Sequence, residues 1–275
     1  MKNSSTARAL WLTTLLLSTL NPQLSTCFAQ GSLTPPGAPA PTFKTLDQIE
    51  PRTPISSVPF TITNSGHFYL TKSLTSTTDG VIINSDDVTL DLNGFTLSGD
   101  SGTGDYGVEV GTSTADGQKR VVIRNGIVRN FGSGVRIESV SSGVLVEGIQ
   151  VHNCAGAGIH LGIIGTNAAY QCTIRNCVMT SNGQDGLFVQ GTSSVLGGRN
   201  VIMDCQAIAN AGSGFSVIGT NNLIIRNLAA RNAINDYNIL ANNRAGIIVT
   251  PALTGTITVG GPGSGTTDPF ANLKY

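Results

Sequence analysis

Three side chains with complementary chemistry follow one another at nearly regular intervals: Glu109, Arg136 and His160, which are 27 and 24 residues apart. A lyase or epimerase that acts on a uronate sugar needs a base to remove the proton beside the carboxylate and a cation to neutralise that carboxylate. Arg136 has the charge to bind a uronate carboxylate, and His160 can act as the base. Phe188, a further 28 residues along, would offer an aromatic surface on which a sugar ring can stack.

The same residues also have a purely structural interpretation, which the sequence leaves open. Glu109 and Arg136 can pair on an exposed face while His160 is solvated, with no substrate involved. Elsewhere, the adjacent Asp86 and Asp87 are more typical of a turn than of the carboxylate pair of a glycoside hydrolase. The His and Cys spacings match no zinc motif, and we predict neither a metal site nor a cofactor.

An internal repeat positions these residues. Six times a glycine precedes an apolar-x-apolar triplet, and Glu109, Arg136, His160 and Phe188 are each the middle residue of one triplet. Successive triplets are 27, 27, 24, 28 and 28 residues apart, beginning at Val81, Val108, Val135, Ile159, Leu187 and Phe215. Because side chains alternate between the faces of a strand, the middle residues should form one outward-facing row.

Each unit also holds a second apolar triplet and, five residues later, a third apolar position. The second triplets begin at Val88, Val121, Val144, Cys172, Val201 and Leu223, and the third positions are Val128, Val151, Met179, Ile208 and Ala230. Three short strands in 22–28 residues are too few for a propeller blade, which needs four in about 40. The pattern predicts an all-β fold, a single-stranded right-handed parallel β-helix of about eight coils.

Two rows of polar residues are expected to align along the coils and fix their register. Charges of alternating sign follow the second triplets and predict an ion-pair ladder of Asp91, Arg124, Glu147, Arg175, Asp204 and Arg226. Asparagines recur at a later turn and predict a stacked amide ladder of Asn130, Asn153, Asn210 and Asn232.

The ends of the chain differ from the repeats. Residues 1–29 combine basic residues with an apolar stretch too short to span a membrane and small residues before Gln30, which predicts a signal peptide cleaved near Ala29. Residues 30–44 are proline-rich and predict a stiff linker. We expect a cap at 45–57, the β-helix at 58–249 and a C-terminal cap or tail at 250–275, covering the open ends of the stack. The mature protein would be secreted, not membrane-spanning, and either a monomer or a trimer assembled through its C-terminal residues.

The composition argues against a nucleic-acid-binding protein and against a wholly disordered chain. Only 12% of residues are charged, the net charge is zero, and no basic stripe is present, so a nucleic-acid partner is not expected. A hydrophobic content of 40% argues against disorder of the whole chain. Export would permit disulfides, but buried free thiols fit equally well the four cysteines that survive cleavage, Cys154, Cys172, Cys177 and Cys205.

Two segments carry a resemblance to a known family. Residues 44–55 (KTLDQIEPRTPI) and 88–95 (VTLDLNGF) resemble exported bacterial right-handed β-helix proteins of the broad pectate-lyase-like superfamily. The resemblance implies an extracellular location and polysaccharide as a partner. It implies no single reaction, because this architecture serves lyases, hydrolases, epimerases, adhesins and tailspikes.

Whether the chain is an enzyme is undecided at this stage. The expected function is a structural or glycan-interacting role at the cell surface or outside the cell. The alternative is a metal-independent lyase or epimerase on acidic polysaccharide that uses Glu109, Arg136 and His160. A groove built by the turns at 98–107 and 111–119 would favour the enzyme, and a trimeric adhesin is a third possibility.

Overall fold

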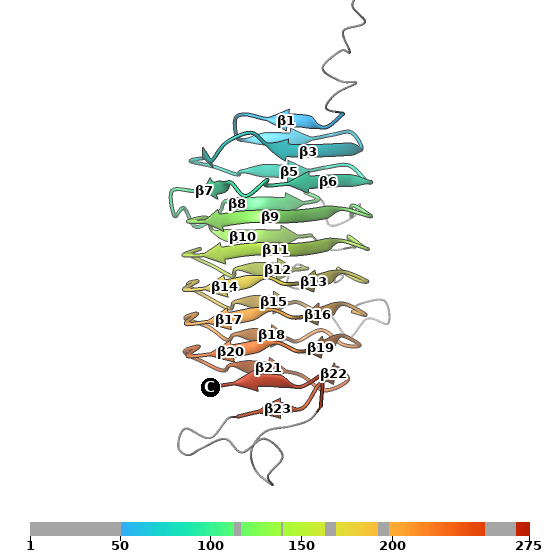
Figure 1. The fold of residues 1–275 in the computed structure, drawn as a ribbon, viewed down its shortest axis with the longest axis vertical. Coiled ribbons are helices and arrows are strands. Elements are labelled where there is room, and N and C mark those ends of the chain that lie inside the picture. Colours follow the sequence, from blue (N-terminus) through green and yellow to red (C-terminus); the bar gives the residue numbers. More distant parts are fainter. Residues whose placement is uncertain (1–50, 113–116, 139, 163–168, 192–197, 251–267) are drawn as a thin grey trace, which may run out of the picture. The chain divides into compact units, whose positions relative to one another are not determined.

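The computed structural model describes residues 51–112, 117–138, 140–162, 169–191, 198–250 and 268–275. The expected signal peptide and linker therefore lie outside the described residues. The described part contains no helix, so it holds none that is long and apolar enough to cross a membrane. Its strands wind into about eight stacked coils, one above the next (Figure 1).

One parallel sheet receives a single strand from each coil. Its order is β2-β5-β8-β10-β12-β15-β18-β21, and adjacent strands pair without slippage. The six predicted triplets lie in six of its strands, and their first and third residues point inward, as Val135 and Ile137 show with no exposed surface. The bounds are β2 (Phe60–Ile62), β5 (Val81–Ile83), β8 (Tyr106–Val110), β10 (Ser133–Ile137), β12 (Ile159–Leu161), β15 (Leu187–Val189), β18 (Phe215–Val217) and β21 (Tyr237–Ile239).

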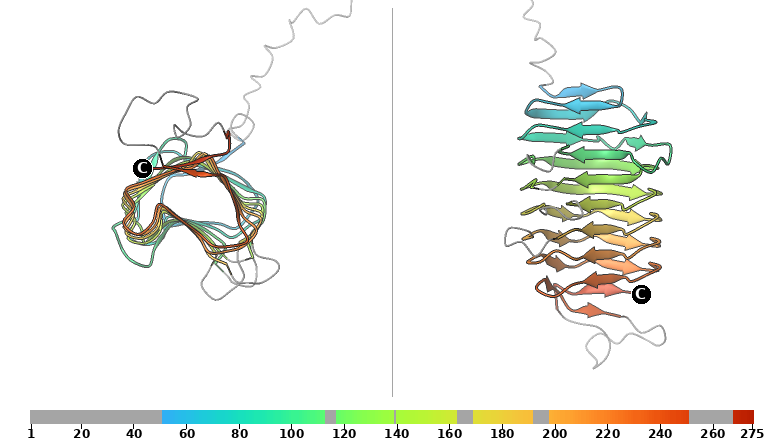
Figure 2. Two further views of the ribbon diagram at one scale, coloured as in Figure 1. Left: turned by 90° about the horizontal axis from the view of Figure 1, so that it is seen from below. Right: turned by 180° about the vertical axis from the view of Figure 1, so that it is seen from behind.

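A second, 16-stranded sheet closes the coil around one continuous apolar core. Seen along the stack, the coils superpose on one another (Figure 2). Its main path is β1 (Thr53–Ile55), β3 (Gly66–Leu70), β6 (Val88–Asp91), β9 (Val122–Arg129), β11 (Leu145–His152), β14 (Val178–Thr180), β17 (Gln206–Ile208), β20 (Leu228–Ala230), β24 (Asn272–Lys274) and β23 (Ile248–Val249). Off this path lie β4 (Leu74–Thr75), β7 (Thr96–Ser98), β13 (Thr173–Arg175), β16 (Val201–Met203), β19 (Leu223–Ile225) and β22 (Arg244–Ala245).

The register of two second triplets differs from the expected one. In β16 and β19 the middle residues, Ile202 and Ile224, are buried, and Val201 and Leu223 face outward. All three residues of each triplet are apolar, so either phase could have faced the core. The inner position that Cys172 fills one coil earlier is taken by Asn200, whose side-chain oxygen accepts a hydrogen bond from the Cys172 backbone N–H at 2.9 Å.

The third apolar positions and the ion-pair ladder shift with this register. Ala207 and Ala229, rather than Ile208 and Ala230, align with Met179 in the inward row. The charge alternation follows one row over four coils only, Asp91, Arg124, Glu147 and Arg175, and Met203 comes next. Asp204 and Arg226 lie one residue further along and pair separately at 2.7 Å.

Buried asparagines stack along the coils in two rows, one of which contains Asn210 and Asn232 of the expected ladder but not Asn130 or Asn153. Asn182, Asn210 and Asn232 donate from one side-chain amide to the next, at 2.9 Å for both links. Asn130 and Asn153 lie one residue earlier in their coils, at a corner with φ near +58°. A second row of this kind joins Asn200 to Asn222 at 2.9 Å. These amides satisfy backbone groups inside the coil and therefore align one coil with the next.

Strands from both ends of the chain join the larger sheet. β1, within the expected N-terminal cap, pairs with β3 and buries Ile55 completely. In the C-terminal tail, β24 lies between β20 and β23 and buries Asn272, whose side chain accepts hydrogen bonds from Asn227. The four cysteines are buried free thiols, one of the two alternatives that the sequence left open, and none forms a disulfide in the described residues.

Candidate functional site

The eight-stranded sheet brings the four predicted site residues together on its outer face. Arg136 in β10 aligns with Glu109 in β8 on one side and with His160 in β12 on the other. Phe188 in β15 aligns next to His160. The predicted row therefore exists over four consecutive coils, although the roles assigned to its members stay predictions.

Arg136 is held in place by three neighbours. It forms an ion pair with Glu138, two residues along its own strand, and only 13% of its side-chain surface is exposed. Its guanidinium lies 4.9 Å from the centre of the Tyr106 ring, and one of its nitrogens lies 3.4 Å from His160 Nδ1. Arg136 forms its ion pair with Glu138 and none with Glu109, so the expectation that Glu109 and Arg136 pair with each other is wrong. Side chains two residues apart share a face, a signal in the sequence that could have identified Glu138.

His160 is largely covered rather than solvated. Burial and the nearby Arg136 charge lower its pKa to about 4, so the ring is neutral at pH 7. Because a guanidinium can only donate, Nδ1 faces it as an acceptor, and the proton belongs on Nε2. Nε2 is buried and has no partner among the described residues. The ring also packs edge-on against Phe188, with centroids 4.9 Å apart.

Glu109 is the carboxyl group whose pKa is best suited to proton transfer. Burial raises its pKa to about 7, helped by the negative charges of Glu138 and Asp79, while Arg136 acts in the opposite direction. Only 8% of the residue is exposed. Asp79, from the preceding coil, accepts a hydrogen bond from the Tyr106 backbone N–H at 2.8 Å. Neither Asp79 nor Tyr106 was predicted to belong to the site, because their proximity depends on how the coils stack.

A pocket of ≈ 280 Å³ opens beside this row. Tyr106, Arg136 and His160 line it together with Ser133 and Gln184, and Thr103 contributes from the turn at 98–107. This turn therefore helps to form a hollow, as an enzyme would require. Part of the turn at 111–119 lies outside the described residues.

Buried polar atoms without a partner gather along the same sheet. Of five such atoms in the described residues, four belong to its strands or directly follow them: Asn84 Oδ1, Glu138 Oε2, His160 Nε2 and Gln190 Oε1. Asn84, Glu138 and Gln190 occupy the same position, one residue after the third residue of a triplet. Buried polar groups in folded proteins almost always have a hydrogen-bond partner, so this concentration marks a surface suited to a polar ligand.

Metal ligation finds no support in the described residues, where no three His, Cys, Asp or Glu side chains are grouped to hold an ion. The acidic residues near Glu109 are instead balanced by Arg136.

Comparison with known proteins identifies the family. The family model described as "Right handed beta helix region" matches residues 60–229. The chain belongs to the right-handed β-helix family. This assignment agrees with the coils, the parallel sheets and the predicted fold class. No curated protein matches the sequence of this β-helix protein.

Solved structures with a similar fold are distant in sequence. A mutant of the periplasmic alginate epimerase AlgG is 15% identical, with a TM-score of 0.49 over 76% of this chain and 49% of the other. The Dettilon tailspike protein is 15% identical, with a TM-score of 0.44 over 73% and 51%. Pectate lyase Pel9A is 18% identical, with a TM-score of 0.42 over 66% and 49%. This β-helix protein thus spans about half the length of each.

Proposed function

We propose that this β-helix protein is exported and binds a polysaccharide along the outer face of its eight-stranded sheet. The observation that carries the proposal is the pocket on this face, where Tyr106, Arg136 and His160 present polar and aromatic groups from adjacent coils, and where the buried His160 Nε2 has no partner among the described residues. Sugar hydroxyls both donate and accept hydrogen bonds, so one glycan chain can satisfy an Nε2–H donor and several carbonyl or carboxylate oxygens.

The shape and charge of the row suit an acidic sugar chain. Consecutive strands in a sheet are about 4.8 Å apart, so a chain lying across four coils would meet a new side chain at each step. Arg136, whose charge is shared with Glu138 in an ion pair, supplies N–H donors, and the exposed part of Phe188 supplies an apolar surface for a sugar ring.

Calorimetric titration with pectate, alginate and a neutral glucan tests the proposal. We expect the acidic chains to bind best, and His160→Ala to weaken binding by about tenfold if this ring is central to the site. His152→Ala is the matched control, since His152 is a partly buried histidine on β11 of the other sheet. Absence of polysaccharide binding, or an equal loss in both variants, would contradict the proposal.

A second candidate is a metal-independent lyase or epimerase, favoured by the pKa of about 7 at Glu109 beside Arg136. In this reaction Glu109 takes the proton at C5 of a uronate while Arg136 neutralises the sugar carboxylate. Return of a proton to the other face gives the epimer. Loss of the C4 oxygen, which leaves with a proton, gives an unsaturated sugar. His160, the expected base, faces Arg136 with its Nδ1, so the proton acceptor of this candidate is Glu109, which aligns with Arg136 on the next strand although it does not line the pocket.

Incubation with polyuronates in heavy water distinguishes catalysis from binding. An epimerase incorporates deuterium at C5, and a lyase produces ultraviolet absorbance from the unsaturated product. Glu109→Gln should abolish either signal while leaving polysaccharide binding within about threefold of the wild type. If the wild type gives neither signal with any acidic polysaccharide, the protein is a binding protein only.

Export is tested by expressing the full chain in a bacterium that secretes proteins to its periplasm. The expected outcome is a periplasmic product whose amino terminus is Gln30. A product that retains Met1 in the cytoplasm would contradict the signal peptide.

A further inference from the structure

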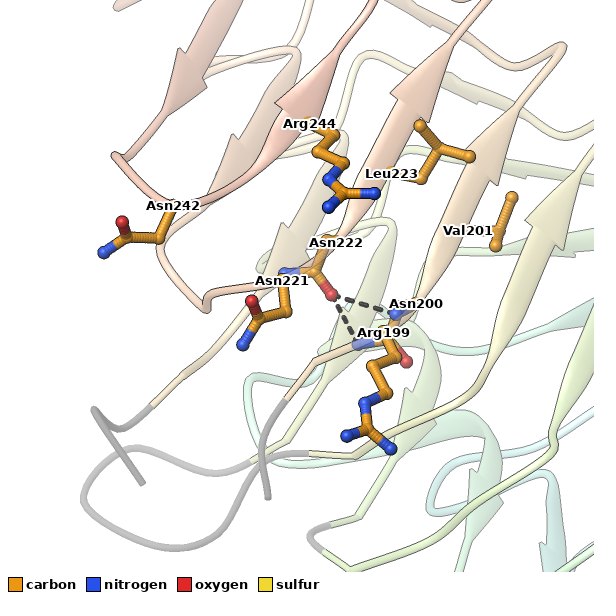
Figure 3. Close-up of a pocket in the computed structure, with 8 residues that line it drawn as sticks. All are labelled: Arg199, Asn200, Val201, Asn221, Asn222, Leu223, Asn242 and Arg244. Carbon is orange, nitrogen blue, oxygen red and sulfur yellow. Dashed lines mark hydrogen bonds between the residues drawn. The ribbon is translucent and has the colours of Figure 1, made fainter. Parts of the chain in front are cut away.

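The described structure has a second and larger pocket, of ≈ 540 Å³, on the 16-stranded sheet. It spans three consecutive coils at the corner that leads into β16, β19 and β22 (Figure 3). It is lined by Arg199, Asn200, Val201, Asn221, Leu223 and Arg244, with Asn222 and Asn242 completing the wall. None of these residues belongs to the site at His160.

The arginines of this pocket differ from most others in the protein. Arg199 and Arg244 are exposed, and neither side chain has an ion-pair partner among the described residues. Five other arginines each pair with a carboxylate: Arg120, Arg124, Arg136, Arg175 and Arg226. The described lining contains no carboxylate, so the pocket carries two positive charges that no carboxylate of the described residues neutralises.

The floor between the arginines is apolar. Val201 and Leu223 lie side by side on adjacent strands, and Arg244 follows them in the same outward row. Leu223 is 36% exposed. The floor is outward because Asn200 and Asn222 take the inner positions, where Asn222 Oδ1 accepts hydrogen bonds from Asn200. The two buried amides thus fix the orientation of the floor, and Asn221 and Asn242 add side-chain amides at the rim, where Asn221 Nδ2 donates to Thr220 Oγ1 at 3.4 Å.

We propose that this pocket is an additional binding site for an acidic oligosaccharide that carries carboxylate or sulfate groups. Arg199 and Arg244 lie on coils two steps apart, about 10 Å along the stack at 4.8 Å per step, and two register positions apart along the strands. This separation suits anionic groups on alternate sugars of an extended chain. Each guanidinium can hold a carboxylate or sulfate through two parallel hydrogen bonds. The aliphatic floor meets the apolar face of a sugar ring, and the rim amides can bind hydroxyl groups.

The composition of the lining favours a sugar chain over a nucleic acid. Single-stranded nucleic acids bind to surfaces that combine extended positive charge with aromatic side chains for base stacking. The described lining has only two cations and no aromatic ring. This inference shares the partner class of the proposed function but none of its residues, and the two can therefore fail separately.

Calorimetric titration of the purified full chain tests this site with four probes: hexagalacturonate, a heparin hexasaccharide, a neutral hexasaccharide and inorganic sulfate. The double variant Arg199→Ala/Arg244→Ala should weaken binding of the acidic hexasaccharides by about tenfold. Arg129→Ala/Arg231→Ala is the control, because it removes two exposed arginines and the same charge from other positions. Comparison of galacturonate with heparin shows whether carboxylate or sulfate is preferred.

A variant that keeps both arginines provides an independent check. Leu223→Glu places a carboxylate on the exposed floor, where it should repel the anionic ligand without disturbing the core, and should cause a comparable loss. His160→Ala should leave the affinity of this pocket unchanged, measured as the second binding event in the titration. The proposal is overturned if the arginine double variant and its control lose affinity equally. It is also overturned if the neutral hexasaccharide, sulfate alone or a short single-stranded oligonucleotide binds as well as the acidic hexasaccharides.

Discussion

At the scale of single residues, the outer row of the eight-stranded sheet controls protonation through burial. Glu109 and His160 are close to the same arginine, yet their pKa values shift in opposite directions, to about 7 and about 4. In both cases desolvation is the largest cause, because it disfavours the charged form of either group. Both side chains are therefore largely uncharged between about pH 4 and pH 7. The row thus avoids the free-energy penalty of burying their charges.

The pKa of Glu109 predicts a pH-dependent stability. The folded chain keeps this proton up to about pH 7, whereas the group ordinarily releases it near 4.5. The folded state therefore binds more protons in this window, and the free energy of unfolding contributed by Glu109 falls as pH rises from 4.5 to 7. Glu109→Gln has no proton to release and therefore avoids this loss. Its free energy of unfolding should rise by about 2 kcal/mol relative to that of the wild type between pH 4.5 and pH 7.

Urea unfolding of the wild type and Glu109→Gln at both ends of this pH window measures the difference in their free energies of unfolding. His160 acts oppositely: its folded pKa of about 4 lies below its ordinary 6.5, so its contribution is lost as pH falls. It is present in both proteins and cancels in the comparison. Parallel stability curves for the wild type and Glu109→Gln would contradict the raised pKa.

At the scale of the elements, rows of stacked side chains set how one strand aligns with the next. Many strands have only three residues, too short to define a register by themselves. The buried amides supply the missing specificity, because each one bridges two coils and also satisfies backbone groups. Asn210, for example, donates to the Met179 carbonyl at 3.1 Å and to Asn232 at 2.9 Å, and its oxygen accepts from Asn182.

A substitution at a residue of the buried row should be costly, whereas one at Asn153, a member of the expected ladder that lies outside this row, should not. Asn210→Asp replaces the donating amide with a carboxylate inside the coil, and we expect a loss of about 3 kcal/mol in the free energy of unfolding. Asn153→Asp is the control, because Asn153 is exposed at a corner where φ is +57°. Urea denaturation of both variants measures the losses. An equal loss would show that the buried row is not what aligns the coils.

At the scale of the whole molecule, the two ends of the described stack differ in exposure. At the first coils the apolar residues Ile55 and Ile62 are almost fully buried. Seven large apolar side chains near the other end are at least 40% exposed: Ile234, Leu240, Ile247, Ile248, Phe270, Leu273 and Tyr275. Exposed apolar residues gathered in one region are typical of a contact surface.

This asymmetry predicts self-association through the C-terminal coils, one of the two assembly states expected from the sequence. Light scattering of the wild type should give a mass that rises with concentration toward an oligomer. Ile234→Lys/Ile247→Lys should lower that mass to a monomer without changing the unfolding midpoint, because both side chains are at least 60% exposed. A constant monomeric mass at every concentration would contradict this prediction and favour the monomer, the other state expected from the sequence.

The sequence alone was enough to predict the repeating unit, six strands of the eight-stranded sheet and the row of Glu109, Arg136, His160 and Phe188. These follow from spacing and from alternation within a strand, which are local properties. The tertiary structure decided the phase of Val201 and Leu223, because a run of three apolar residues fits either phase. It also decided the pairing of Arg136 with Glu138 and the protonation of Glu109. Pairing and desolvation depend on neighbours from other coils, whose packing no single repeat contains.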